Sequence, residues 1–139
     1  MEFHFQIKNR CSELGVLQAT LLGLEKKWSL TSKTILELNL ILDELVSNIV
    51  EHGDSEQESA IDIRLTKKNA LITLVVTDDG PPFDPTFTPT VDITVPLEER
   101  KCGGLGIHLI RKFSNSCNYK RVKNQNVLTL EKILDEECR

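Results

Sequence analysis

The sequence has 139 residues, of which 40% are hydrophobic and 27% are charged. A chain of this length and composition can bury one core, so we expect a single domain over residues 1–139. Its formal charge of −4 and pI near 5.4 argue against nucleic acid or an anionic membrane as the main partner. No apolar run approaches the roughly 18 residues of a membrane span, and the N-terminus lacks a signal peptide's apolar core, so we expect a cytoplasmic protein.

The first predicted elements are a strand and two helices. The strand is indicated by apolar residues that alternate with polar ones, namely Phe3, Phe5 and Ile7. The first helix is indicated by apolar residues at spacings of four, three and four, namely Leu17, Leu21, Leu24 and Trp28. A second helix is predicted from about Lys33 to His52. Thr31 and Ser32 can cap its start, and Gly53 favours its end.

The chain then predicts a hairpin and a long loop. The hairpin strands are indicated by the alternating residues Ile61, Ile63 and Leu65 and by the apolar run Leu71–Val76. A tight turn between them is expected at Lys67–Asn69. From Asp79 to Cys102, five prolines disfavour regular structure. A loop this long inside a compact domain is usually functional, often as a lid.

The last part of the chain predicts a helix and a second hairpin. The helix is expected from Gly104 to about Phe113. Strands are expected at Tyr119–Val122 and Val127–Leu134, with a turn at Lys123–Asn126. This order of elements favours an α+β fold, a two-layer sandwich in which helices cover one face of a mixed, mainly antiparallel sheet.

Glu44 and Asn48 are the first residues that could carry chemistry. They are four apart, so on a helix they share one face. They could be two polar residues on a solvated face, or a general base and a metal ligand. An amide oxygen suits Mg²⁺, which prefers oxygen ligands and keeps several waters. A carboxylate could accept the proton of a hydroxyl or water that attacks a γ-phosphate.

The acidic turn Asp78-Asp79-Gly80 follows an apolar strand. One interpretation is an ordinary type I turn, for which Asp and Gly are typical residues. In the alternative, Asp78 is a buried acceptor for the exocyclic amino group of adenine, and Gly80 allows close approach of the backbone.

Three glycines, Gly103, Gly104 and Gly106, open the predicted third helix. Glycines let backbone N–H groups gather around an anion, and a helix N-terminus favours phosphate; a flexible hinge gives the same letters. The spacing is that of neither a Rossmann motif nor a P-loop. Arg100 and Lys101 could neutralise phosphate charge or be exposed loop cations.

Other candidate residues have little support. The histidines (His4, His52 and His108) show no metal-ligand spacing, and the cysteines (Cys11, Cys102, Cys117 and Cys138) form no C-x-x-C pair. A zinc site, a redox motif and nucleophilic hydrolase chemistry are therefore not indicated.

Three segments, taken in this order, resemble the N, G1 and G2 boxes of the Bergerat-fold ATPases: Ile41–Gly53, Val76–Pro85 and Gly103–Ile110. The resemblance is closer to one branch, the anti-sigma-factor serine kinases of bacterial partner switching (the RsbW and SpoIIAB type). The segments that carry it are Asp78–Pro85, Pro96–Leu109, Tyr119-x-Arg121 and Asn126–Lys132. It covers nearly the whole chain.

That resemblance implies a site for ATP and Mg²⁺. Glu44 would be the catalytic base, Asn48 the Mg²⁺ ligand, and Asp78 the adenine acceptor with Gly80 beside it. The residues implied to line the phosphates are Gly103, Gly104 and Gly106. Thr129 matches a late-strand threonine that reaches adenine through water. Pro82 departs from the pattern, because many Bergerat proteins have a second glycine there.

The function implied by the resemblance is that of an ATP-dependent protein-serine kinase. It would phosphorylate a serine on a STAS-domain antagonist and bind a sigma factor or another target, and a homodimer is expected. The alternative is a nucleotide-dependent binding module that sequesters a partner without phosphoryl transfer. The presence of both Glu44 and Asn48 favours the kinase. A histidine kinase would need a phosphoacceptor helix before the domain, and a gyrase-like or Hsp90-like ATPase a transducer domain after it.

Overall fold

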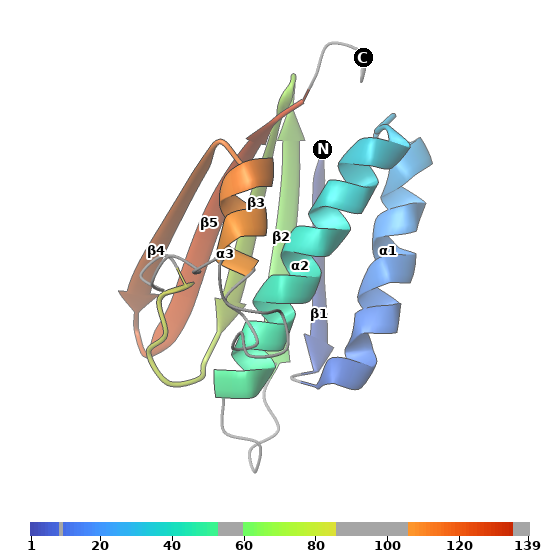
Figure 1. Ribbon diagram of the computed structural model, residues 1–139. Coiled ribbons are helices and arrows are strands. Elements are labelled where there is room, and N and C mark those ends of the chain that lie inside the picture. The colour runs from blue at the N-terminus through green and yellow to red at the C-terminus, as the bar shows by residue number, and fades with distance from the viewer. Residues whose placement is uncertain (9, 53–59, 86–105, 135–139) are drawn as a thin grey trace, which may run out of the picture.

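The computed structural model describes residues 1–8, 10–52, 60–85 and 106–134 (Figure 1). The elements in chain order are β1 (Glu2–Lys8), a 3-10 turn (Cys11–Glu13), α1 (Leu14–Lys27), α2 (Ser32–His52), β2 (Ala60–Lys68), β3 (Leu71–Asp78), α3 (Gly106–Phe113), β4 (Ser116–Val122) and β5 (Gln125–Ile133). The strands form one sheet in the order β1-β2-β3-β5-β4, and each adjacent pair is antiparallel.

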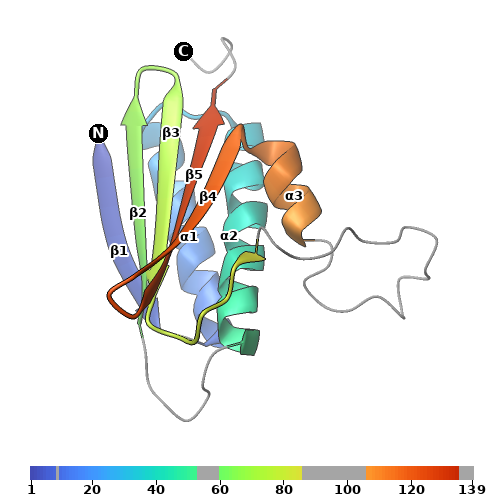
Figure 2. The ribbon, with the colours of Figure 1, turned by 90° about the vertical axis from the view of Figure 1, so that its left-hand side faces the viewer.

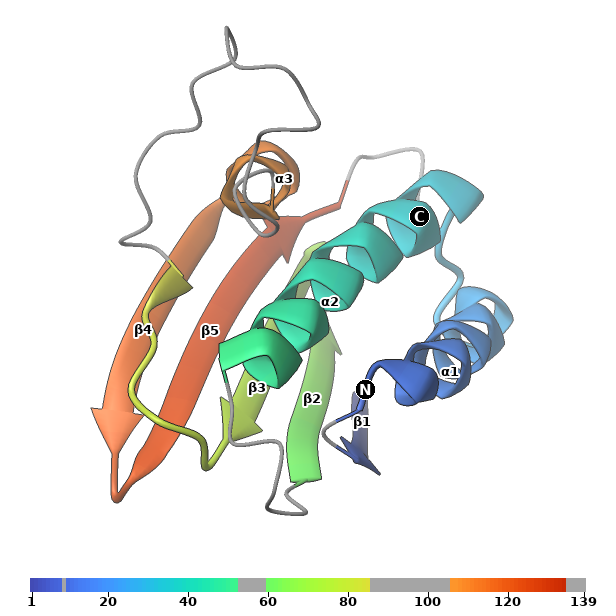
Figure 3. The same cartoon turned by 60° about the horizontal axis from the view of Figure 1, so that its bottom comes forward.

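The helices cover one face of this sheet (Figure 2). Seen from below, α2 lies across the middle of the sheet, α1 lies on the β1 side, and α3 lies near β4 and β5 (Figure 3). This arrangement confirms the expected α+β sandwich. None of the helices in the described residues is long and apolar enough to cross a membrane.

The core lies between the helices and the sheet, and the sequence periodicities predict it. The fully buried side chains include Leu17 and Leu21 from α1, Ile41 and Leu42 from α2, and alternate residues of the strands, such as Ile61, Ile63, Ile72 and Leu74. Each such side chain contributes about 1.5–3 kcal/mol through removal of apolar surface from water. The start of α2 is capped as expected, since the backbone N–H of Thr34 donates to Oγ1 of Thr31 at 3.1 Å.

Strand boundaries differ from the prediction where hairpins turn. The turn expected at Lys67–Asn69 lies at residues 69–70, because Lys67 and Lys68 continue the ladder between β2 and β3. Asn69 has a φ of 55°, a left-handed conformation that asparagine tolerates better than most residues. On the other side of the sheet, β4 begins at Ser116 rather than Tyr119.

The second hairpin turn is also shorter than predicted. It consists of Lys123 and Asn124, whose φ angles of 49° and 65° fit a two-residue hairpin turn with both central residues left-handed. The expected turn at Lys123–Asn126 is therefore wrong at its C-terminal end. Asn126 belongs to β5, where it is paired with Asp78 of β3.

A buried ion pair joins α2 to the end of the sheet. Nζ of Lys132 lies 2.5 Å from Oε2 of Glu37, and the two side chains are only 9% and 13% exposed. The same ammonium donates to the backbone carbonyl of Phe113, at 2.9 Å, where α3 ends. One side chain of β5 thereby holds both neighbouring helices.

We expect Lys132→Met to lower the free energy of unfolding by about 3–5 kcal/mol, because it leaves the Glu37 carboxylate buried without its partner. Urea denaturation measures this loss, and the double variant Lys132→Met with Glu37→Leu should recover much of it. Lys120→Met, at an exposed position of β4, is the control and should change stability by less than about 0.5 kcal/mol. A loss in Lys132→Met no larger than the control's would contradict a stabilising pair.

Candidate functional site

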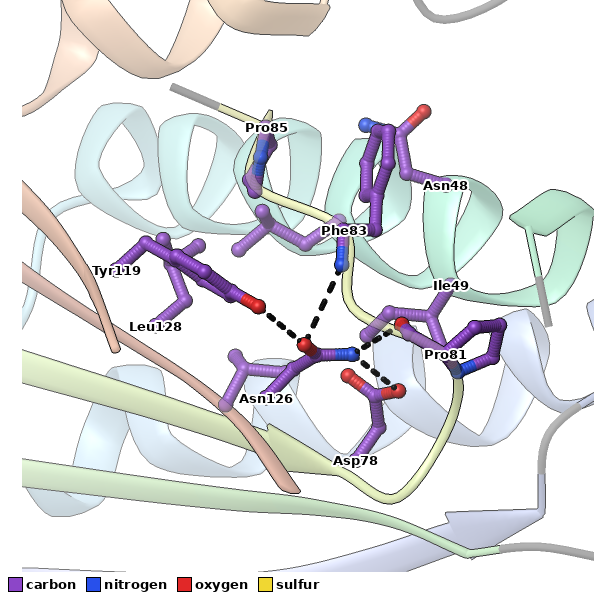
Figure 4. Close-up of a pocket in the computed structure, with 11 residues that line it drawn as sticks. Asn48, Ile49, Asp78, Pro81, Phe83, Pro85, Tyr119, Asn126 and Leu128 are labelled. Carbon is purple, nitrogen blue, oxygen red and sulfur yellow. Dashed lines mark hydrogen bonds between the residues drawn. The ribbon is translucent and has the colours of Figure 1, made fainter. Parts of the chain in front are cut away.

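A pocket lies between the C-terminal half of α2, the C-terminal end of β3, the first residues of β5 and the chain that follows β3 (Figure 4). Its walls are mostly apolar, as is typical of small-molecule sites. The lining residues are Leu45, Asn48, Ile49, Val76, Asp78, Pro81, Phe83, Pro85, Tyr119, Asn126 and Leu128. The structure thus brings together Asn48 and Asp78, two residues that the sequence singled out separately.

Asp78 ends β3 and is buried, with 6% of its surface exposed. Its Oδ2 accepts a hydrogen bond from the backbone N–H of Gly80 at 2.9 Å. Burial raises the pKa of this carboxyl, while the bonds from Gly80 and Asn126 and the charge of Arg121 work in the opposite direction. Asp78 therefore bonds locally to the turn that follows β3, and it also lines the pocket with a buried carboxylate.

Asn126 is a site residue that the sequence interpretation missed. It is 7% exposed, and its Nδ2 donates to Oδ2 of Asp78 (3.2 Å) and to the carbonyl of Pro81 (2.9 Å). Figure 4 shows its amide between Asp78 and Tyr119, whose hydroxyl donates to Oδ1 at 2.5 Å. The two-residue turn was the available signal, because it pairs Asn126 with Arg121 and so extends β5 to the pocket.

Thr129 does not belong to the pocket, and the expectation for it is corrected. Along β5 the residues facing the helices are Asn126, Leu128, Leu130 and Lys132, each of them buried. Since successive strand residues point to opposite faces, Thr129 lies on the other face of the sheet, paired with Val75. The resemblance selected a residue of the right strand but of the wrong face.

Glu44 and Asn48 do not lie on a solvated helix face. Asn48 is 6% exposed and lines the pocket. Glu44, one turn earlier on α2, is half-buried, and its Oε1 has no hydrogen-bond partner within the described residues. Burial raises the pKa of the Glu44 carboxyl, and the negative charge of Glu51 raises it further. A carboxylate of this kind is suited to accept a proton.

The side-chain oxygen atoms of Glu44, Asn48 and Asp78 fit a magnesium nucleotide. The amide oxygen of Asn48 is a hard ligand of the kind that Mg²⁺ accepts. The unpartnered oxygen of Glu44 can accept a hydrogen bond from a hydroxyl or a water. The carboxylate of Asp78 can accept one from an amino group of a base.

Four of the residues predicted to hold the phosphates lie outside the described residues, as does most of the long loop: Arg100, Lys101, Gly103 and Gly104. Gly106 is the first described residue of α3.

Cys117 and His4 lie away from the pocket. Burial raises the pKa of the Cys117 thiol to about 11, so this side chain stays protonated and unreactive at neutral pH. His4 contacts Asp62 between β1 and β2. Neither residue is among those that line the pocket.

Comparison with known proteins identifies the family. Residues 7–132 match the histidine kinase-like ATPase domain. The chain is 30% identical to the serine/threonine-protein kinase BtrW of Bordetella bronchiseptica over 110 residues, which cover 78% of this chain and 76% of that protein. It is 21% identical to the serine-protein kinase RsbW of Bacillus cereus over 140 residues, which cover 98% and 88%.

Solved structures share the fold. The RsbU and RsbW domains of a Mycobacterium tuberculosis protein align with a TM-score of 0.69 at 14% identity over 96% of this chain, which spans 32% of that one. A histidine kinase domain from Erythrobacter litoralis aligns with a TM-score of 0.54 at 13% identity, covering 92% of this chain and 62% of that one. The chain therefore belongs to the histidine kinase-like ATPase domain family, within its branch of serine/threonine-protein kinases of the RsbW type.

Proposed function

We propose that this kinase is the central component of a partner switch. It transfers the γ-phosphoryl group of ATP to a serine of a STAS-domain antagonist, and it binds a sigma factor or another target when that antagonist is phosphorylated. The relatives named serine-protein kinases support the chemistry. The switched partner comes from the resemblance to the anti-sigma branch, which also predicts a homodimer.

In this proposal the pocket holds the adenosine end of ATP. Asp78 accepts a hydrogen bond from the adenine amino group, and the apolar residues around it cover the ring. Gly103, Gly104 and Gly106, with Arg100 and Lys101, hold the phosphates. The amide oxygen of Asn48 binds Mg²⁺, which supplies positive charge against the phosphate oxygens.

Glu44 acts on the attacking hydroxyl. Its carboxylate takes the proton of the substrate serine as the serine oxygen forms its bond to the γ-phosphorus. The bond from that phosphorus to the bridging oxygen breaks, and ADP leaves with the electron pair. The observation that carries the proposal is the buried, unpartnered Oε1 of Glu44, one helical turn from the buried Asn48.

The decisive experiment incubates the protein with Mg²⁺, labelled ATP and STAS-domain proteins encoded near its own gene. We expect one STAS protein to acquire a phosphoserine, located by mass spectrometry, and sedimentation of the kinase alone tests the homodimer. A complex that forms only with nucleotide and yields no phosphoserine would favour the binding module instead. Absence of nucleotide binding in calorimetry would reject both functions.

The pH dependence of transfer provides a further check on Glu44. Because its pKa is raised, the base becomes protonated as the pH falls, and the acid limb of kcat should have its midpoint above the ordinary value of 4.5. Glu51→Gln removes the second cause of the shift. We therefore expect this variant to move the acid limb to lower pH while the maximal rate changes little, as measured in rate–pH profiles of both proteins. An unchanged profile would mean that another group titrates.

A further inference from the structure

The orientation of the Asn126 amide is fixed by its neighbours. Three groups meet its Oδ1: the hydroxyl of Tyr119 (2.5 Å), Nη1 of Arg121 (3.1 Å) and the backbone N–H of Phe83 (3.4 Å). A guanidinium and a backbone N–H can only donate, so the atom that faces them must be the oxygen. The NH₂ group consequently points to Asp78 and Pro81.

This orientation makes the two oxygens of Asp78 unequal. Oδ2 accepts from the backbone N–H of Gly80 at 2.9 Å and from Nδ2 of Asn126 at 3.2 Å. Within the described residues, these are the hydrogen bonds of this carboxylate. Oδ1 therefore remains as the acceptor that the pocket can offer to a ligand.

The same side chain also holds the turn that follows β3. Asn126 bonds both the carbonyl of Pro81 and the N–H of Phe83, and Arg121 donates to the carbonyl of Gly80 at 2.7 Å. Pro82 lies inside this clamped segment, where many Bergerat proteins have a more flexible glycine. Two restraints therefore act on this turn. Proline limits its backbone, and the β4–β5 hairpin holds it through hydrogen bonds.

We propose that Asn126 is a positioning residue that sets the base specificity of the nucleotide site. It keeps Oδ2 of Asp78 engaged and presents Oδ1 to the 6-amino group of a purine. A purine with a carbonyl oxygen at position 6 would place that oxygen against Oδ1, which is also an acceptor, and the two would repel each other. The inference rests on the proposed function for the location of the base, and it assigns part of the discrimination between bases to a residue that acts through Asp78.

The test compares ATP with purine riboside triphosphate, which lacks the 6-amino group, using calorimetry of the full chain with Mg²⁺. We expect the wild type to bind ATP more tightly by roughly tenfold or more, as for a hydrogen bond to a charged acceptor. In Asn126→Leu the carboxylate loses its orienting partner. The ratio of the two dissociation constants should then fall by roughly tenfold, towards one.

Two further variants separate positioning from loss of stability. Leu130→Val truncates a buried residue of the same strand, so it should lower stability and leave the ratio unchanged. If Asn126→Leu does not fold, Tyr119→Phe takes its place in the test. This variant removes one donor to Asn126 and keeps the fold, so it should lower the ratio of the two dissociation constants partly. A ratio equal to that of the wild type in the folded variants, despite lower stability, would overturn the inference. If the wild type bound neither triphosphate, the proposed function itself would fail.

Discussion

Glu44→Gln should abolish phosphoryl transfer and leave ATP binding nearly unchanged. The substitution keeps the size of the side chain but removes the acceptor that takes the serine proton, and loss of a general base lowers a rate by about 10²–10⁴-fold. Because Oε1 has no hydrogen-bond partner within the described residues, its replacement breaks no hydrogen bond of that atom there. Single-turnover measurements with labelled ATP give the rate, and calorimetry gives the affinity.

Glu51→Gln is the matched control, since it removes a carboxylate from an exposed position of the same helix, two turns away. We expect this variant to transfer phosphate at nearly the wild-type maximal rate. Transfer that persists in Glu44→Gln at a comparable rate would reject Glu44 as the base and leave the nucleotide site intact.

Asp78→Asn should weaken ATP binding by about 100-fold, close to 3 kcal/mol. An amide at this position can turn its NH₂ group either to the donors of Gly80 and Asn126 or to the adenine amino group, and each choice sets donor against donor. The affinity falls because one of these hydrogen bonds must be lost.

The same substitution should not unfold the protein. The pKa of Asp78 is raised in the folded state, so its charge opposes folding at neutral pH, and the wild type gains stability as the pH falls through this raised pKa. The neutral amide avoids that cost, and urea denaturation should show stability near that of the wild type. Asp79→Asn, at the exposed neighbouring position, should retain ATP affinity. Equal losses of affinity in both variants would reject Asp78 as the specific acceptor.

Periodicity predicted most of the fold because burial dictates it. The spacing of Leu17, Leu21 and Leu24 selects one helix face, and alternation in β2 and β3 selects one sheet face. Turn boundaries were predicted less well. In both hairpins, polar residues next to the turn are still paired in the strands. Polar residues are also typical of loops, so polarity alone predicted turns that were too long.

Two of the residues that line the pocket, Asn48 and Asp78, were singled out from the sequence alone. Asn48 stands out because it shares a helix face with Glu44, four residues earlier, and Asp78 because an acidic turn follows an apolar strand. Asn126 could not be recognised in this way, because its role depends on which face of β5 it occupies. A shift of one residue reverses that face, and the same ambiguity produced the wrong expectation for Thr129.

Strand β5 also connects the two parts of the chain that flank residues 86–105. The chain before residue 86 is fastened to its beginning through Asn126, and α3, after residue 105, is fastened to its end through Lys132. One rigid strand therefore sets the separation of the two attachment points. That separation depends on the register of β5 against its two neighbouring strands. A substitution that shifts this register would therefore displace both attachment points together.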